Sequence, residues 1–200
     1  MGYRIVSAFV LLVLAAACGA PPAETPPPAT TPAATPAPAT PVGPVTPPST
    51  DEDKIRSAMS AGPEAVSKDA TVMDMATMKV LKQGTNGWTC FADGPSPGVD
   101  PMCLDQNGLE WANAWMSKKD PPKGKLGIGY MLMGGSDASN TDPFATTPAP
   151  SGTWVDTGPH MMVLNIGNSF AGYPTTADNT KVPYVMFPGT PYAHLMIPVK

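Results

Sequence analysis

Short apolar runs separated by turn-forming residues dominate the second half of the chain. Residues 126–133 form an uncharged apolar run of the length of one strand buried on both faces, and a long loop is expected to follow over residues 134–152. Four more runs bounded by turn residues predict strands, at residues 153–156, 160–166, 184–187 and 194–198. This half of the chain therefore predicts a sheet of several strands.

Alternating apolar and polar positions occur earlier in the chain, at residues 70–74 and 78–82, and both segments predict short strands. The pair Asn86-Gly87 then favours a tight hairpin turn. We therefore expect the strand at residues 78–82 to pair with the strand that follows it, at residues 88–91.

Two segments carry the signals of helices. Ser49 and Glu52 fit a capping box, so the first helix is expected to begin there and to end at Gly62-Pro63. The second helix is expected over residues 104–119, with Asp105 able to cap it. The apolar residues that share one face of this helix, and should pack on the sheet, are Trp111, Ala112 and Trp115.

Strands outnumber helices, and the two kinds of element are mixed along the chain. We therefore predict an α+β domain over residues 51–200, with a mainly antiparallel sheet covered by one or two helices. A segment of about 150 residues is long enough for one hydrophobic core. A signal peptide over residues 1–17 and a disordered Pro/Ala/Thr-rich linker over residues 18–50 are expected to precede the domain.

The start of the chain has the composition of a secretory signal. Arg4 is followed by an apolar run over residues 5–17 that only Ser7 interrupts. This run is too short for a membrane-spanning helix, and small residues precede Cys18 as they do at a cleavage site. We therefore expect residues 1–17 to be a signal peptide.

The run Leu14-Ala15-Ala16-Ala17-Cys18 resembles the lipobox of bacterial lipoproteins, in which signal peptidase II cuts before a cysteine that is then acylated. The leucine stands four residues before the cysteine, where the commonest pattern has three. The resemblance implies lipidation of Cys18, and Gly19 in place of an aspartate implies the outer membrane of the cell envelope, with the domain on either side of it. The alternative is a secreted protein released by ordinary cleavage after Ala17.

The linker consists almost wholly of Pro, Ala and Thr, and Glu24 is the only charged residue between positions 20 and 50. Such a segment has too little apolar surface to offset the entropy of ordering, and its prolines favour extended polyproline II. We interpret it as a spacer between the anchor and the domain. A proline-rich docking motif or a glycosylated stalk is the alternative.

The charge of the chain argues against nucleic acid as a partner. The chain has 12 Lys and Arg against 16 Asp and Glu, a formal net charge of -4, and no basic cluster able to neutralise a run of phosphates. The expected partners are the lipid bilayer, through Cys18, and a small-molecule or protein ligand whose identity the residues leave open.

Cys90 and Cys103 are the only cysteines beyond the leader. In an exported protein they are expected to form a disulfide across one loop. A thiolate metal site or a catalytic thiol is not favoured, because neither cysteine has a Cys-x-x-Cys partner or a nearby histidine in sequence.

The two histidines lie in similar settings, since each is followed two residues later by a methionine. In a strand such residues share a face, so His160 with Met162 and His194 with Met196 would together offer two imidazole nitrogens and two thioethers. Thioethers suit Cu(I), and copper is therefore the candidate cofactor. The alternative is that both histidines are structural, bonded to backbone carbonyls, and that the 13 methionines fill the core.

Two further hypotheses use other side chains. Ser136 or Ser139, with a histidine and Asp137 or Asp142, would make a hydrolase, although no nucleophile-elbow pattern is present. Four tryptophans would instead line a groove for a peptide or a sugar, namely Trp88, Trp111, Trp115 and Trp154. A non-enzymatic binding module is our first prediction for the domain, copper binding the second and hydrolysis the third.

Five segments, at residues 84–90, 100–103, 139–143, 158–160 and 189–192, are similar to a group of exported bacterial proteins that are uncharacterised. The first of them reads Gly-Thr-Asn-Gly-Trp-Thr-Cys. This resemblance implies that the domain is a recurring unit, and it supplies neither an activity nor site residues.

Overall fold

The computed structural model describes residue 2 and residues 47–148, 154–167 and 169–199. The predicted signal peptide, the predicted lipidation site Cys18 and most of the predicted linker lie outside these residues. The described residues from 47 onward belong to one compact unit.

An eight-stranded sheet forms the centre of this unit, with the strand order β2-β1-β3-β4-β5-β8-β10-β9. Every neighbouring pair in it is antiparallel except β1 and β3, which are parallel. The strands of the sheet are β1 Thr71–Met73, β2 Val80–Lys82, β3 Thr89–Phe91, β4 Met102–Leu104, β5 Gly127–Met131, β8 His160–Leu164, β9 Tyr184–Met186 and β10 His194–Pro198. The predicted α+β fold with a mainly antiparallel sheet is confirmed.

Three helices accompany the sheet in the described part of the chain, namely α1 Asp51–Ser60, α2 Glu64–Ser67 and α3 Gln106–Met116. Asp105 caps α3 as predicted, because its carboxylate accepts a hydrogen bond of 2.7 Å from the Gly108 N–H. The cap predicted for α1 is wrong by one residue: Thr50, and not Ser49, accepts from the Asp53 N–H. The Thr50 hydroxyl lies three residues before Asp53, which is the spacing that an N-cap requires.

The helices α1 and α3 cover opposite faces of the sheet. Val72, Cys90 and Cys103 lie in register across β1, β3 and β4 and pack with Ala58 of α1 in one buried cluster. Side chains alternate between the faces of a strand, so the neighbouring residues of these strands point to the other face. There α3 contributes Trp111 and Ala112 to a larger buried cluster, which includes the following residues of the sheet: Phe91, Leu104, Met131, Met162, Leu164, Tyr184, Met186 and Met196.

The contact between α3 and the sheet depends on glycines at both partners. A Cβ atom placed on Gly127 of β5 would lie 2.7 Å from the Cα atom of Gly108 in α3, which is closer than real Cβ contacts. Because neither residue carries a side chain, the first turn of the helix rests directly on the strand.

The hairpin predicted at Asn86-Gly87 is wrong, because β2 pairs with β1 and not with β3. The Asn86 amide is used for other contacts: its Nδ2 donates to the Val66 carbonyl at 2.7 Å and its Oδ1 accepts from the Trp88 N–H at 3.0 Å. The Thr85 N–H donates to the Asp69 carbonyl, which carries the chain past the start of β1. As a result β3 is added on the far side of β1, parallel to it.

The long loop predicted over residues 134–152 contains a strand that its composition does not suggest. Gly135–Asp137 forms β6, which pairs with β7, Val155–Thr157, in a separate two-stranded sheet. The Ser136 N–H also donates to Oδ1 of Asp100 at 2.7 Å. This strand therefore depends on its pairing with β7 and on the Asp100 carboxylate, and not on a pattern of hydrophobic residues.

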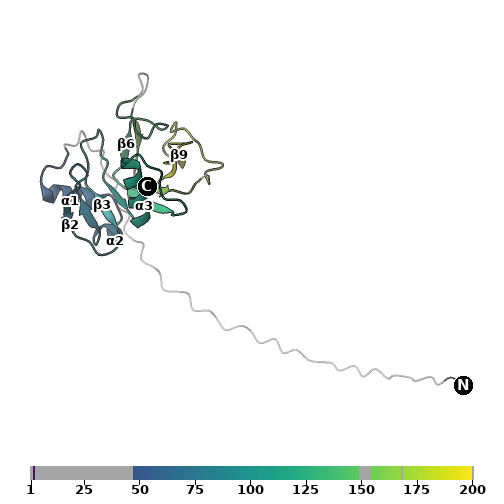
Figure 1. Cartoon of the computed structure of the whole chain (residues 1–200), viewed down its shortest axis with the longest axis horizontal. Helices are drawn as coiled ribbons and strands as arrows, with labels where there is room; N and C mark the ends of the chain where they lie inside the picture. The colour runs from purple at the N-terminus through teal and green to yellow at the C-terminus, as the bar shows by residue number, and fades with distance from the viewer. Residues whose placement is uncertain (1, 3–46, 149–153, 168, 200) are drawn as a thin grey trace, which may run out of the picture. The chain divides into compact units, whose positions relative to one another are not determined.

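Two strands lie at the edges of the large sheet, β2 at one end and β9 at the other. The blue elements of Figure 1 gather at the first edge, and β9 lies toward the yellow end of the colour scale. Along β9, the Val185 N–H donates to the Pro174 carbonyl, and just beyond it the Phe187 N–H donates to the Asn140 carbonyl. These loop carbonyls occupy the side of the strand that faces away from β10.

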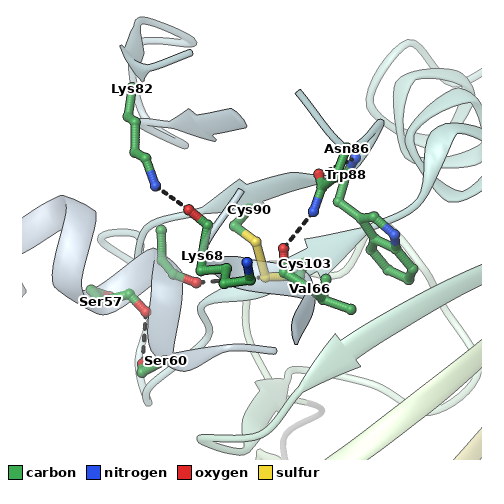
Figure 2. The surroundings of a disulfide bond; sticks show 10 residues. Ser57, Ser60, Val66, Lys68, Lys82, Asn86, Trp88, Cys90 and Cys103 are labelled. Atoms are coloured by element: carbon green, nitrogen blue, oxygen red, sulfur yellow. Dashed lines mark hydrogen bonds between the residues drawn. A yellow bond between two sulfur atoms is a disulfide. The ribbon is translucent and has the colours of Figure 1, made fainter. Parts of the chain in front are cut away.

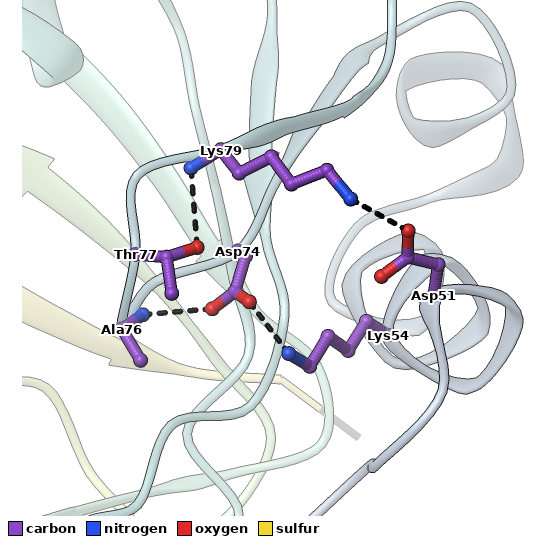
Figure 3. A network of polar contacts seen from close by, with 6 residues as sticks. All are labelled: Asp51, Lys54, Asp74, Ala76, Thr77 and Lys79. Carbon is purple, nitrogen blue, oxygen red and sulfur yellow. Dashed lines mark hydrogen bonds and ion pairs between the residues drawn. The ribbon is translucent and has the colours of Figure 1, made fainter.

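Ion pairs fasten α1 to the turn between β1 and β2 (Figure 3). Lys54 contacts Asp74 with a distance of 2.5 Å between Nζ and Oδ2, and Lys79 contacts Asp51 at 2.8 Å. Asp74 also accepts from the Ala76 N–H, and the hydrogen bond from Lys54 lowers the pKa of the Asp74 carboxyl. The exposed pair contributes little, whereas the Asp74 contact is largely shielded from water.

The predicted disulfide between Cys90 and Cys103 is confirmed, with an Sγ–Sγ distance of 2.01 Å. The two residues face each other across β3 and β4 (Figure 2). Both pack with Ala58 of α1 and Val66 of α2, and the sulfur of Cys103 lies 3.6 Å from the Ala58 carbonyl oxygen. The bond closes a loop with a sequence separation of 13. It therefore links β3 to β4 covalently on the face of the sheet opposite α3.

Replacing both cysteines, Cys90→Ala with Cys103→Ala, should lower the free energy of unfolding by about 3 kcal/mol, because the unfolded chain regains the freedom of that loop. Urea unfolding of the purified variant measures the loss. Cys18→Ala, which removes the one cysteine outside the disulfide, is the control and should unfold as the wild type does. Equal unfolding free energies for the double variant and the wild type would show that the bond adds no stability.

Candidate functional site

The four predicted metal ligands all lie on the face of the sheet that α3 covers. In the pairing of β8 with β10, Met162 is directly opposite Met196, and His160 is opposite Pro198. His194 lies four residues before Pro198, which is roughly 13 Å along the strand. The register therefore brings the two methionines together and puts the two histidines at opposite ends of the ladder.

Both imidazoles are buried, with exposed fractions of 2% for His160 and 4% for His194. In each ring Nδ1 lies within hydrogen-bond distance of a carbonyl two residues earlier, 2.8 Å from Gly158 O and 2.9 Å from Tyr192 O. A carbonyl can only accept, so Nδ1 carries the proton and Nε2 keeps a free lone pair. Burial lowers the pKa of His160, and it lowers the pKa of His194 to about 4, so His194 is neutral at physiological pH.

A cavity of about 330 Å³ lies between α3, this face of the sheet and β6. His194 and Met162 line it, whereas His160 and Met196 do not. The other side chains on its walls, most of them missed by the sequence reasoning, are Met75, Met102, Leu104, Trp111, Ala112, Trp115, Met116, Met131 and Phe187, with Ser96, Asp100, Ser136 and Asp137 as polar groups.

The histidine in the cavity is held by aromatic rings. The ring centroid of His194 lies 5.2 Å from that of Trp111 and 5.5 Å from that of Phe187, with both pairs close to edge-to-face. Together with the hydrogen bond to Tyr192, these contacts fix both the tautomer and the direction of the ring. Nε2 is the ring nitrogen left for an external partner.

An outer groove of about 560 Å³ adjoins this inner cavity. Both hollows are lined by Trp115, Met116 and Ser136, and the groove extends to Trp154 and Phe144. Of the four tryptophans considered for a groove, Trp115 and Trp154 are on the walls of this one. Of the remaining two, Trp111 lines the inner cavity, and Trp88 packs at a tilt against Tyr130 on the other face, with ring centroids 5.6 Å apart.

Two carboxyl groups stand where the cavity and the β6 strand meet. Oδ1 of Asp100 accepts from the Ser136 N–H, while Asp93 accepts from the Asp100 N–H at 2.7 Å. Burial raises the pKa of Asp100 to about 7, and the nearby carboxylates of Asp137, Asp93 and Asp156 add to the effect. Burial also raises the pKa of Asp137 to about 6. The pKa values of both carboxyl groups therefore lie closer to neutral pH than those of exposed aspartates.

The contacts needed for a hydrolase are not found among the described residues. No hydrogen bond there joins Ser136 or Ser139 to an imidazole, and the Ser139 hydroxyl accepts instead from the Asp142 N–H at 2.9 Å. The imidazoles themselves are oriented by backbone carbonyls and not by a carboxylate.

In the part of the chain that the structure describes, no three His, Cys, Asp or Glu side chains lie close enough together to hold a metal ion. In the same residues no helix has the length and apolar character needed to cross a membrane.

Comparison with protein-family models, with curated proteins and with solved structures finds no match to the chain.

The raised pKa of Asp100 predicts how stability depends on pH. A carboxyl whose pKa is higher in the folded protein than in the unfolded chain lowers the free energy of unfolding as pH rises. For Asp100 this loss begins near pH 4, where the carboxyl ionises in the unfolded chain, and is complete above about pH 7, where it ionises in the folded protein. Asp100→Asn keeps an acceptor for the Ser136 N–H and removes this cost. The variant should therefore gain unfolding free energy relative to the wild type between pH 4 and 7, measured by urea unfolding at several pH values.

His194 has the opposite pH dependence: because its pKa is lower in the folded protein, the free energy of unfolding decreases as pH falls below about 6.5. This contribution is present in both proteins and cancels in their difference. Stability curves for Asp100→Asn and the wild type that run parallel across this range would contradict a buried, proton-holding Asp100.

Proposed function

We propose that the domain is a non-enzymatic binding module of the bacterial cell envelope, and that its ligand occupies the inner cavity. The observation that carries this proposal is the composition of the cavity walls. They are mainly aromatic and thioether side chains with a few polar groups, among them His194 and Asp100, which is the usual make-up of a small-ligand site. Its volume of about 330 Å³ suits a small ligand.

The arrangement of the two hollows supports entry of the ligand from solvent. The outer groove shares Trp115, Met116 and Ser136 with the inner cavity, so a ligand that reaches the groove lies beside the inner site. The aromatic faces of Trp115 and Trp154 offer apolar contact in the groove. Asp100 and Asp137 favour a ligand that carries positive charge or donates hydrogen bonds.

The leader gives the location of the module in this proposal. Acylation of Cys18 would hold the protein on the outer membrane more firmly than a single acyl chain can, because lipobox cysteines receive several chains. A linker of about 30 extended residues would then let the domain work up to roughly 90 Å from the lipid. Binding at such a distance requires no further contact of the domain with the bilayer.

Filling the inner cavity tests the ligand site. Ala112→Leu adds a side chain from α3 into the cavity and should weaken binding of the neutral fluorophore phenylnaphthylamine at least about tenfold, a loss of about 1.4 kcal/mol. Fluorescence titration of the full-length protein measures the affinity. Ala114→Leu makes the same change on the same helix at a residue that lines neither hollow, and it should bind as the wild type does. If both variants and the wild type bind alike, or none binds, the ligand site lies elsewhere.

The anchor has a separate test. Cys18→Ala should move the protein from the membrane to the soluble fraction, or leave it with an uncleaved leader of higher mass, because no acyl chain can be attached. Fractionation of bacteria that produce each form, followed by intact-mass measurement, distinguishes these results. A wild-type protein whose mass shows no acyl chains would exclude lipid attachment.

A further inference from the structure

We infer that the ligand of the inner cavity is an amphipathic amine, whose ammonium group binds at Asp100 and Asp137 and whose apolar body lies against the aromatic and thioether side chains of the walls. Such a molecule carries one protonated nitrogen at the end of an apolar chain or ring, and the cavity offers a matching wall for each part. This inference rests on the proposed function, which places the ligand in the inner cavity, and it adds the chemical class of that ligand.

The two carboxyl groups are positioned by β6 and by the loop before β4. Oδ1 of Asp100 accepts from the Ser136 N–H at 2.7 Å, which ties the loop to the strand. Asp137 is two residues from Gly135 on β6, so their side chains share one side of the strand. A Cβ atom on Gly135 would lie 2.9 Å from Cε of Met131, so this side of β6 faces the interior. Both carboxyl groups accordingly line the cavity.

No cation balances these carboxyl groups in the part of the chain that the structure describes. Neither group is in an ion pair there, and no Lys or Arg is among the residues that line the cavity. Lys118, which lines the outer groove, lies over the Phe144 ring, 5.0 Å from its centroid. Burial raises the pKa of Asp100 to about 7 and that of Asp137 to about 6, as expected for carboxyl groups without a cationic partner. A positively charged ligand would supply the missing partner.

His194 adds a polar group from β10. Its Nδ1–H is donated to the Tyr192 carbonyl, so Nε2 points away from that carbonyl and keeps its lone pair. The side chain lines the cavity and is only 4% exposed. Burial lowers the pKa of His194 to about 4, so the ring carries no positive charge that would repel an ammonium group. The imidazole and the ionised carboxyl groups are all acceptors, which favours a ligand that donates hydrogen bonds.

The remaining walls are apolar and suit the body of such a ligand. Trp111 and Trp115 both line the cavity, and their rings stack with centroids 6.2 Å apart. Indole rings attract an ammonium group that lies within about 6 Å, and they also offer flat apolar surface. Methionine side chains are flexible and adapt to apolar groups of different shape. Those on the walls are Met75, Met102, Met116, Met131 and Met162.

Other charged ligands fit these walls less well. A carboxylate or a phosphate would be repelled by Asp100 and Asp137 and would find no Arg or Lys on the walls to bind it. A bare metal ion needs several donor atoms within about 2–2.6 Å of one point, and no three His, Cys, Asp or Glu side chains of the described residues lie so close together. An amine with an apolar body extends through the cavity, so it does not require all the polar groups to converge on one atom.

Three probes with one carbon skeleton test the charge of the ligand. They are phenylbutylamine, phenylbutanol and phenylbutanoate, which are a cation, a neutral molecule and an anion. Each competes with phenylnaphthylamine for the full-length protein at about pH 8, where both carboxyl groups are ionised. The amine should compete at least about tenfold more strongly than the alcohol, because its hydrogen bonds join two charged groups. The anion should be the weakest competitor.

A matched pair of variants locates the charge that matters. Asp137→Asn keeps the size of the side chain, and it should weaken binding of the amine at least about tenfold. It should leave the affinity for the alcohol unchanged, which would show that the cavity is intact. Asp156→Asn is the control, because Asp156 lies opposite Ser136 on β7, is exposed and lines neither hollow. Since salt screens an exposed charge, this variant should change amine affinity by less than about twofold.

The dependence on pH provides a second measurement. The carboxyl groups must lose their protons to bind an ammonium group, so amine affinity should rise between about pH 5 and about pH 8. The carboxylates of Asp93, Asp137 and Asp156 lie near Asp100 and help to keep its pKa high, whereas His194 stays neutral over this range. An alkyl amine keeps its proton throughout, and the alcohol has no charge, so the affinity for the alcohol should change much less.

Three results would overturn the inference. These are equal competition by the amine and the alcohol, competition by phenylbutanoate as strong as that by the amine, or a loss with Asp156→Asn as large as that with Asp137→Asn. In each case the proposed binding site stands if Ala112→Leu still weakens binding of the fluorophore. If neither the fluorophore nor any of the three probes binds, by calorimetry as well as by fluorescence, the inference and the proposed function both fail.

Discussion

The contact between Gly108 of α3 and Gly127 of β5 sets the geometry of the whole face on which the cavity lies. Two backbones touch there because neither residue has a side chain. One turn later the helix presents Ala112 and Trp115, which face large side chains of the sheet across an open space. The backbones of the helix and the sheet are in contact at the start of α3, and the cavity lies beside its later turns.

Much of the local structure could be predicted because it depends on residues close in sequence. The cap at Asp105 and the strand at His194–Pro198 follow from spacing alone, and the disulfide joins the only two cysteines of the predicted domain over residues 51–200. The order of the strands could not be predicted in the same way. Asn86-Gly87 has the composition of a hairpin turn, but the Val66 carbonyl takes up the Asn86 side chain, and no local signal indicates that contact.

The same limit applies to the candidate site. The alternation rule places His194, Met196 and Met162 on one face correctly, but it says nothing about which strands are neighbours. Met131 and Met102 enter the cavity only because β5 and β4 follow β8 in the sheet. The only sequence signal for them is an excess of methionine, and flexible core filling explains such an excess equally well. The sequence alone does not determine which strands pair when they are far apart along the chain.

The closed edge at β9 has a consequence for contacts between copies of the domain. Exposed strand edges recruit strands from other molecules, and the risk grows when many copies are confined together. Here the outward N–H groups of Val185 and Phe187 already have acceptors in the Pro174 and Asn140 carbonyls of the same chain. Another copy of the chain would therefore find these N–H groups already paired, so this edge of the sheet offers little template for a further strand.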